Sequence, residues 1–283
     1  MPVSLISSNQ ESGRLSRSQV NQLIDLDRYP IDQLESGAGR DLIEICHNNL
    51  ATQAIALLPG FIRPSAISGM AEEAQDLIDQ AYRYDQPRVA FYEHPNHHHR
   101  AHDGDDWSTL RSKRHPNRYC QILNYQIPNN SNLRAIYLWP KLTEFVRRVL
   151  DVNRLYPSVC PHLALTMKVA FEGDLDGWHY DPNDGVITLM LQPSESGGEF
   201  EYAPYIRNEQ EENYTGVKRL FDSPDTEAQR IKLEAGTFTL FNGRFSMHRV
   251  RPVGSTKQPR IVAIFSYDER PDMVFSQDYI DML

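Results

Sequence analysis

Cysteine is scarce in this sequence, and its scarcity excludes the small proteins that depend on disulfide bonds. Only Cys46, Cys120 and Cys160 are present among the 283 residues, and they lie far apart. An odd number of scattered cysteines favours neither a disulfide framework nor a metal site built from paired cysteines. Because free thiols persist in reducing compartments, we expect a cytoplasmic protein.

Long apolar runs without charge are absent as well. A membrane-spanning helix needs roughly 18 or more such residues in succession, and no segment reaches that length. The first residues, MPVSLISSNQESGRLSR, are polar and lack the apolar stretch of a signal peptide. The sequence therefore predicts neither a membrane span nor export.

Positive charge is also in short supply. The chain has 29 Lys and Arg residues against 38 Asp and Glu, which gives a net charge of −9. Binding to a phosphate backbone depends on clustered Lys and Arg, so we do not expect a nucleic-acid partner. With 40% hydrophobic and 10% aromatic residues, the composition is typical of a globular protein and allows a sizeable core.

The front half of the sequence reads as helical. Residues 39–50, 64–83 and 133–150 show the apolar spacing of amphipathic helices, and a short apolar run near residue 55 indicates one strand. Residues 88–118 are rich in His, Asp, Arg and Asn and lack periodicity. Long loops of this kind inside compact domains are usually lids or binding segments, so we predict a lid.

The back half changes to short apolar runs separated by Gly, Pro, Asn and Asp, which is typical of a β-sandwich or barrel. We predict a single domain over residues 1–283, with helical support and a lid loop over about 1–117 and a β-rich core over about 118–275. Residues 208–220 indicate a polar, partly helical insert. Six strands are expected, in HLALTMKVAFEG, GVITLMLQ, GEFEYAPYI, RIKLEAGTFTLFNG, MHRVRPV and PRIVAIFSY.

A candidate metal site begins at Trp178-His179-Tyr180-Asp181. If this segment is extended, side chains alternate, so His179 and Asp181 point to the same face and can bind one ion. His248 lies on a distant strand that a barrel can bring alongside. Two histidines and one carboxylate on one side of a metal leave the other side open, which is the facial arrangement of Fe(II) oxygenases that use O2.

An arginine is expected at the far end of such a site. The chelating end of 2-oxoglutarate would occupy two metal positions, and its distal carboxylate needs a fixed cation, for which the planar fork of arginine is suited. Arg260 opens the strand after His248 and shares its face with Val262, Ile264 and Ser266. Arg251 is the alternative. Thr188 shares a face with Met190 and Gln192 and is a candidate for lining the same polar cavity.

Other residues could contact a substrate. Trp178 comes just before His179, Trp107 lies within the predicted lid and Tyr119 just after it, although Trp107 and Tyr119 fit core positions equally well. The consecutive His97, His98 and His99, with His94, His102 and His115 nearby, lack the spacing of metal ligands. We interpret these six histidines as surface or lid residues.

The back half resembles the double-stranded β-helix, or jelly-roll, core of the iron(II)- and 2-oxoglutarate-dependent oxygenases. Three blocks, LMLQPSESGGEFEYAPYIRNEQEENY, LFNGRFSMHRVRPV and PRIVAIFSYDERP, resemble the branch of BesD-type free-amino-acid halogenases and hydroxylases, over about residues 160–275. A weaker similarity lies in ALLPGFIRPSAISGMAEEA. The resemblance implies His179, Asp181 and His248 as iron ligands, Arg260 as the cosubstrate anchor and a small polar amino acid as substrate.

The sequence differs from the halogenating members of that branch at one position that distinguishes halogenation from hydroxylation. Halogenating members have a small residue in place of the ligand carboxylate, whereas this sequence has Asp181. We therefore expect a hydroxylase that uses Fe(II), 2-oxoglutarate and O2 on a small molecule; desaturation or cyclisation of a natural-product intermediate is the alternative. A zinc hydrolase and a non-catalytic metal-binding jelly roll also remain open, although the sequence lacks an HExxH motif. The sequence does not indicate the oligomeric state.

Overall fold

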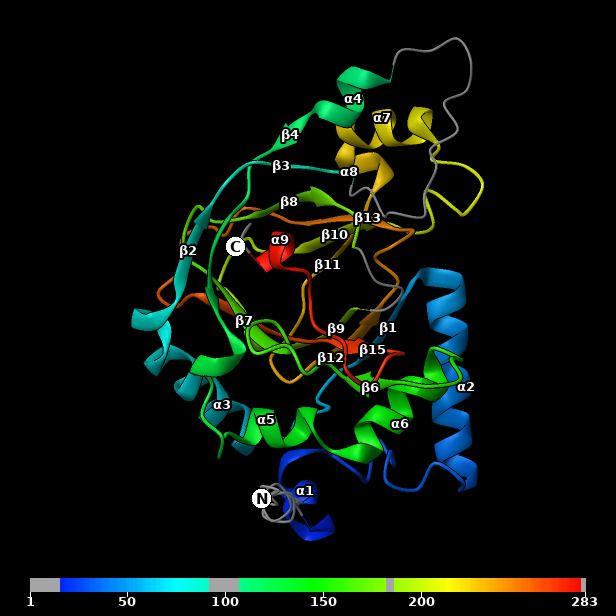
Figure 1. Cartoon of the computed structure of the whole chain (residues 1–283), viewed down its shortest axis with the longest axis vertical. Coiled ribbons are helices and arrows are strands. Elements are labelled where there is room, and N and C mark those ends of the chain that lie inside the picture. Colours follow the sequence, from blue (N-terminus) through cyan, green and yellow to red (C-terminus); the bar gives the residue numbers. More distant parts are fainter. Residues whose placement is uncertain (1–15, 92–106, 182–185, 281–283) are drawn as a thin grey trace, which may run out of the picture.

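The computed structural model describes residues 16–91, 107–181 and 186–280. Its centre is a pair of antiparallel sheets that face each other (Figure 1). The larger sheet has seven strands in the order β1-β12-β9-β14-β7-β5-β2. These strands are β1 (Ile55–Leu58), β2 (Tyr82–Asp85), β5 (Arg118–Ile122), β7 (Leu165–Ala170), β9 (Val186–Gln192), β12 (Phe238–Phe241) and β14 (Arg260–Phe265).

The smaller sheet has four strands in the order β11-β10-β13-β8. From β7 onward, the chain crosses repeatedly between the two sheets, so that β8, β10 and β13 of the smaller sheet alternate with β9, β12 and β14 of the larger one. This winding is the predicted jelly-roll architecture, and the expected fold class is confirmed. The strands of the smaller sheet are β8 (Asp176–His179), β10 (Phe200–Ala203), β11 (Gln229–Ile231) and β13 (Met247–Val250).

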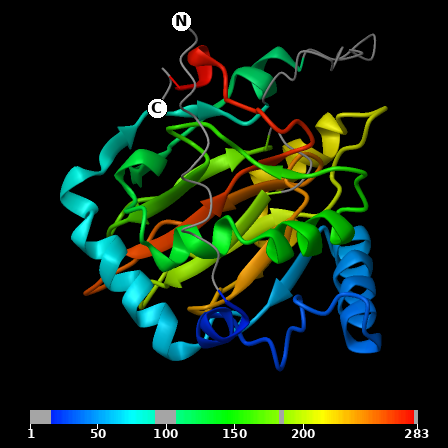
Figure 2. The ribbon, with the colours of Figure 1, turned by 60° about the horizontal axis from the view of Figure 1, so that its bottom comes forward.

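Helices from the front half cover the outer face of the larger sheet (Figures 1 and 2). Their apolar faces join the sheet in the main hydrophobic core, which includes Leu50, Met70 and Phe145. Burial of this apolar surface is the main stabilising contribution to the packing of helices on the sheet. The helices are α1 (Arg17–Leu23), α2 (Gly37–Gln53), α3 (Pro64–Asp76), α5 (Asn132–Tyr137) and α6 (Pro140–Val149).

Two of the predicted elements are divided in the structure. The amphipathic stretch 133–150 forms α5 and α6, because Pro140 can begin a helix but cannot continue one. The predicted strand segment 230–243 forms β11 and β12, which lie in different sheets. Gly236 makes this change of sheet possible, with φ of 80° and the Ile62 carbonyl oxygen only 2.8 Å from where a Cβ would stand.

A second layer covers the outer face of the smaller sheet, and it contains α4 (Ser108–Ser112), α7 (Tyr214–Asp222) and α8 (Pro224–Glu227) (Figure 1). Parts of the predicted lid are ordered, because β3 (Arg88–Val89) pairs with β4 (Arg114–His115). The middle of that segment, 92–106, lies outside the described residues. The remaining short elements are β6 (Tyr156–Pro157), β15 (Tyr267–Asp268), α9 (Gln277–Ile280) and the 3-10 turns at Ile78–Gln80 and Asn124–Gln126.

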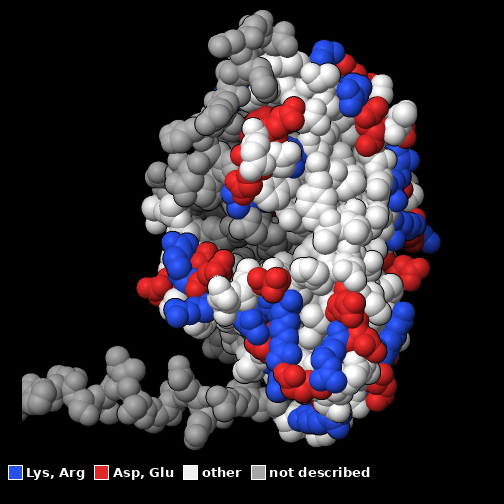
Figure 3. Space-filling view, turned by 90° about the vertical axis from the view of Figure 1, so that its right-hand side faces the viewer, with Lys and Arg blue, Asp and Glu red and all other residues white. Residues whose placement is uncertain are grey.

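On the face shown in Figure 3, side chains of both signs are interspersed over the lower part, below a broad uncharged area. An ion pair of Arg148 with Glu35 connects α6 to the segment before α2, and a second pair, with Glu144, lies within α6. Within the described ranges, no helix is both long and apolar enough to cross a membrane.

Candidate metal centre

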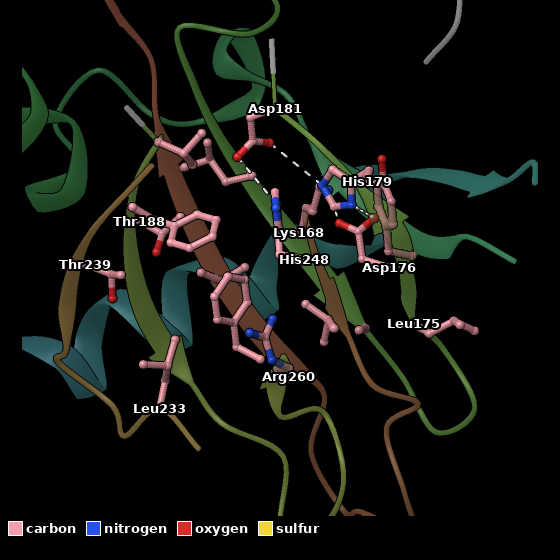
Figure 4. A pocket seen from close by; sticks show the side chains of 18 residues that line it. Lys168, Leu175, Asp176, His179, Asp181, Thr188, Leu233, Thr239, His248 and Arg260 are labelled. Carbon is pink, nitrogen blue, oxygen red and sulfur yellow. Dashed lines mark hydrogen bonds and ion pairs between the residues drawn. The ribbon is translucent and has the colours of Figure 1, made fainter. Parts of the chain in front are cut away.

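His179 and His248 are brought together by strand pairing. β8 and β13 are antiparallel neighbours in the smaller sheet, and His179 and His248 are directly opposed in their register. Their ring centroids are 4.1 Å apart, and both rings are buried. Asp181 follows the end of β8 and completes a group of three residues whose candidate ligand atoms all lie within 4.8 Å of one another (Figure 4).

The same local hydrogen bond orients both imidazoles. His179 Nδ1 lies 2.7 Å from the carbonyl oxygen of Gly177, and His248 Nδ1 lies 3.0 Å from that of Ser246. An Nδ1–H donor to a carbonyl leaves Nε2 with its lone pair, which is the arrangement found in metal-binding histidines. In both rings this Nε2 faces Asp181.

The carboxylate of Asp181 faces both histidines. Its Oδ2 is 3.4 Å from His248 Nε2, and its Oδ1 is 3.8 Å from His179 Nε2. Burial alone would raise the pKa of Asp181, but the two facing histidines lower it to about 2. Oδ2 is buried and has no hydrogen-bond partner among the described residues. A buried, ionised carboxylate that faces two imidazole nitrogens and keeps one oxygen unpartnered fits a bound cation, because buried charges normally have a partner.

A cavity between the two sheets opens beside these three residues, and Arg260 enters it from β14 (Figure 4). Arg260 is only 5% exposed, and its Nε donates a hydrogen bond to the carbonyl oxygen of Gly198 at 3.0 Å. Burial lowers its pKa to about 10. Within the described part of the chain, no carboxylate forms an ion pair with this guanidinium. A buried arginine in this state fits an anionic ligand.

Strand alternation around Arg260 is as expected, since Val262 and Ile264 also line the cavity. Arg251, the alternative anchor, lies outside the cavity. It lies on the other side of the smaller sheet, where its Nη1 donates to Glu201 Oε1 at 2.8 Å, and it does not line the cavity.

Two threonine hydroxyls contribute polar atoms to the cavity wall. Thr188 on β9 lines the cavity as expected, and it pairs in register with Thr239 on β12. Sequence reasoning missed Thr239. Its Oγ1 is buried and unpartnered among the described residues, so it can donate to a ligand in the cavity.

Comparison with known proteins shows which family the chain belongs to. The sequence model of a family described as halogenase D matches residues 96–279, which is more than half of the chain. The chain belongs to the halogenase D family. A search of curated proteins gave no match.

Solved structures share the fold of this halogenase D family member. A carbocyclase from nogalamycin biosynthesis, SnoK, has a TM-score of 0.53 at 11% identity and covers 84% of this chain and 89% of its own. The epimerase SnoN, in complex with Fe3+, alpha ketoglutarate and nogalamycin RO, has a TM-score of 0.52 at 12% identity, covering 81% and 84%. A 2OG-Fe(II) oxygenase family protein from Burkholderia pseudomallei has a TM-score of 0.50 at 12% identity, covering 81% and 92%. At these identities, the similarity shows a common jelly-roll fold.

In this member of the family, the cavity also contains an ion pair that sequence reasoning missed. Lys168 on β7 lies 2.5 Å from Asp176 on β8, and the Arg88 guanidinium lies 3.4 Å from the same carboxylate. Burial alone would raise the pKa of Asp176, but Lys168 foremost among its charged neighbours holds it well below the usual range. Tyr119 also lines the cavity, and Lys168 Nζ lies 4.3 Å from its ring centroid.

A β-bulge explains why Asp176 was missed. In the pairing of β8 with β13, His179 opposes His248, but Asp176 opposes Val250, so β8 has one extra residue. Regular alternation would place Asp176 and His179 on opposite faces of the strand. The bulge instead allows both side chains to face the cavity.

Trp178 and Trp107 do not line the cavity. Trp178 is buried on the opposite face of β8, because it alternates with His179, and the Arg249 guanidinium lies 4.6 Å from its ring centroid. Trp107 is half-buried and stacks on Tyr214 of α7 with centroids 5.4 Å apart. Both residues therefore contribute to the packing of the helical layer on the smaller sheet rather than to the cavity.

The histidine-rich segment is described only at His115. That residue is buried, its ring lies 4.6 Å from the ring of Phe221, and burial lowers its pKa to about 4. Of the two interpretations, surface or lid, burial contradicts the surface position of His115, and its part in a lid stays a prediction. His94, His97, His98, His99 and His102 lie outside the described residues.

Proposed function

We propose that this protein is an Fe(II)- and 2-oxoglutarate-dependent dioxygenase that hydroxylates a small polar metabolite, a free amino acid or a derivative of one. The observation that carries the proposal is that a candidate metal site and a candidate carboxylate-binding arginine line the same cavity. Three side chains with the donor set of a facial metal site converge on one point, and a buried arginine that pairs with no carboxylate among the described residues lines the same cavity. The fold shared with 2-oxoglutarate oxygenases supports the same assignment.

His179, Asp181 and His248 would hold the iron through two Nε2 atoms and one carboxylate oxygen. When bound, Fe(II) and 2-oxoglutarate supply the oxidising chemistry: 2-oxoglutarate and O2 give succinate and carbon dioxide, and the second oxygen atom goes to the substrate. No side chain of the cavity needs to act as a general base. The role of the chain is to fix the ligands, orient both organic molecules and exclude water.

Arg260 would hold the distal carboxylate of 2-oxoglutarate through its two Nη groups, because its Nε is already bonded to Gly198. The Thr239 hydroxyl, with Thr188 across the strand pair, would supply neutral hydrogen bonds to the same ligand. Apolar side chains such as Phe200 and Phe241 line the wall beside His248 and limit the access of water. Tyr119, Lys168 and Asp176 form the remaining polar wall, and we assign it to the substrate.

Hydroxylation is favoured over halogenation by counting metal positions. An octahedral ion has six positions, of which the three side chains would fill three and 2-oxoglutarate two, so only one is left for O2. The family match favours halogenation as the second candidate. Asp181 opposes it, because this carboxylate would occupy the position that is left to chloride in the halogenating proteins that the sequence resembles. Desaturation and cyclisation need the same ligands and stay open as outcomes of the same oxidative chemistry.

Two other classes are disfavoured by the same cavity. A zinc hydrolase needs a metal-bound water and a nearby general base, and has no use for a buried cation placed to bind a carboxylate. A non-catalytic metal-binding module would also gain nothing from a buried arginine that forms no ion pair among the described residues. The proposal keeps the predictions of a single domain over residues 1–283 and of a cytoplasmic location.

The test is an assay of the Fe(II)-loaded protein with 2-oxoglutarate, O2 and a panel of free amino acids and related small metabolites. We expect succinate to form faster with one group of compounds, and the product to be heavier by one oxygen atom. Abundant chloride should give no chlorinated product. Substantial chlorination would mean that Asp181 is not a ligand, and a failure to form succinate with any compound would favour the non-catalytic module.

A further inference from the structure

The turn that follows β12 lies directly against Asp181. Residues 242–246 connect β12 to β13, and the Asp181 amide donates a hydrogen bond to the Gly243 carbonyl oxygen at 3.1 Å. The turn thus contacts both the backbone and the side chain of the residue that completes the metal site.

No side chain fits at position 243 while Asp181 points toward the histidines. A Cβ added to Gly243 would lie 1.7 Å from Asp181 Oδ2, 2.6 Å from its Cγ and 3.0 Å from its Cβ. Contacts below 3.0 Å between such atoms are prohibitive. The φ angle of Gly243 is not in the left-handed region, so its backbone conformation suits an alanine as well. Glycine is therefore needed at position 243 to leave room for the Asp181 carboxylate, and not for its backbone conformation.

The turn itself is fixed from both sides and cannot readily retreat from a clash. The Asn242 amide donates to the Ala54 carbonyl oxygen at 2.9 Å. On the other side, Arg207 Nε donates to the Arg244 carbonyl oxygen at 2.7 Å, and Arg207 is itself buried. The Asp181 carboxylate, by contrast, is held by no hydrogen bond through Oδ2 among the described residues. The carboxylate is therefore the group that would move.

We propose that Gly243 is the positioning residue that admits a carboxylate ligand at position 181, so that residues 181 and 243 together determine how many protein ligands the metal receives. A side chain at position 243 turns the Asp181 carboxylate away from the two histidines. Both imidazoles stay in place, because their orienting hydrogen bonds are to Gly177 and Ser246. The vacated metal position then accepts an external anion such as chloride. The part of this inference that concerns chloride rests on the proposed function.

The first test needs no metal. The variants Gly243→Ala, Asp181→Gly and the double substitution are compared in the apoprotein by thermal unfolding. Gly69→Ala is the matched control, because a Cβ added at Gly69, in α3, meets nothing within 4 Å. Asp181→Gly is used because it also removes the Asp181 Cβ. We expect Gly243→Ala to lower Tm clearly in the wild-type background, to leave Tm unchanged in the Asp181→Gly background, and Gly69→Ala to cause no loss.

Additive effects of the two substitutions on Tm would overturn the inference, because they would show that Gly243 is needed for a reason other than space for Asp181. If Gly243→Ala alone fails to fold, the double variant decides: a folded double variant supports the steric account, and an unfolded one contradicts it.

The second test measures metal and chloride binding under anaerobic conditions. Loss of support for a ligand typically weakens metal binding about 10- to 100-fold, and we expect that range for Fe(II) binding to the Gly243→Ala variant. Adding chloride should then change the visible absorption of the Fe(II) and 2-oxoglutarate complex in this variant, but not in the wild type or in Gly69→Ala. A chloride-insensitive variant with unchanged Fe(II) affinity would contradict the inference. If the wild-type protein binds neither Fe(II) nor 2-oxoglutarate, the proposed function fails, and the apoprotein comparison still decides the role of Gly243.

Discussion

The two faces of the smaller sheet differ in whether their buried polar groups have partners within the chain. On the inner face, the Nε2 atoms of His179 and His248 face the Asp181 carboxylate, whose Oδ2 has no hydrogen-bond partner among the described residues. On the outer face, the carboxylate of Glu201 is 1% exposed and accepts hydrogen bonds from three arginines, Arg230, Arg249 and Arg251.

This difference indicates that the inner face binds ligands and that the outer face stabilises the sheet. On the outer face, the buried charge of Glu201 is neutralised by arginines of the same chain. The Arg249 guanidinium also lies over the Trp178 ring, so these contacts hold the strands together. On the inner face, polar atoms such as Asp181 Oδ2 and Thr239 Oγ1 have no partner among the described residues and can bind a ligand. Substitutions on the inner face should therefore change binding and activity with little loss of stability, whereas substitutions on the outer face should do the reverse.

The largest expected effect is on the inner face. In the His248→Ala variant, 2-oxoglutarate decarboxylation should fall to background, because the metal loses a ligand. The apoprotein should unfold within a few degrees of the wild-type temperature, because the outer-face contacts that fix the strands, such as those of Arg249 with Glu201 and Trp178, are unchanged. Thermal unfolding and a succinate assay measure the two quantities. Residual activity near the wild-type level would remove His248 from the site.

The next effect concerns the cosubstrate. In Arg260→Leu, the 2-oxoglutarate requirement should rise about 100-fold or more, because removing one partner of a buried charge pair costs about 3 to 5 kcal/mol. Fe(II) affinity should stay close to wild type. Arg251→Leu is the matched control, because Arg251 is the other candidate anchor and pairs with Glu201 outside the cavity. Equal dependence on 2-oxoglutarate in both variants would move the anchor elsewhere.

On the outer face, Glu201→Ala should lower the free energy of unfolding by about 3 kcal/mol, because three arginines lose the buried carboxylate that they share. The apparent affinity for 2-oxoglutarate should not change in the fraction that stays folded. Denaturant unfolding and a 2-oxoglutarate titration measure the two quantities. A loss of 2-oxoglutarate binding at unchanged stability would contradict the division between the faces.

The smallest effect is a pH dependence from the same residue. Burial alone would raise the pKa of Glu201, but its hydrogen bonds to the arginines lower it below the ordinary value of 4.5. A lowered pKa in the folded state gives stability that is present above the ordinary pKa and is lost as the pH falls below it toward the folded-state value. Glu201→Gln should therefore lose less stability than the wild type when denaturant unfolding is repeated at successively lower pH. An identical acid response would mean that Glu201 is not held ionised by its neighbours.

Some of the site could be predicted from the sequence because it depends on strand alternation alone. Alternation places His179 with Asp181, and Arg260 with Val262 and Ile264, and the structure has these groupings. The same rule, applied to the residue just before His179, places Trp178 on the opposite face of β8, where it lies. The prediction of Trp178 as a substrate contact ignored this consequence.

The rest depended on register and long-range contacts, which a sequence does not reveal. Asp176 reaches the cavity only through the bulge in β8, and its pairing with Lys168 joins strands of two different sheets. Thr239 is paired with Thr188 by the register of β12 on β9. A glycine in a turn such as Gly243 gives no local sign that its missing side chain makes room for a residue more than sixty positions earlier.

The central claim is that the inner face of β8 and β13 holds Fe(II), with 2-oxoglutarate between that iron and Arg260. The most direct measurement is an anaerobic titration of 2-oxoglutarate into the Fe(II)-loaded protein, followed by the charge-transfer absorption of the iron. We predict a saturable band that is absent in His248→Ala and needs far more 2-oxoglutarate in Arg260→Leu. An absorption that does not change with 2-oxoglutarate, or that changes equally in all three proteins, would contradict the claim.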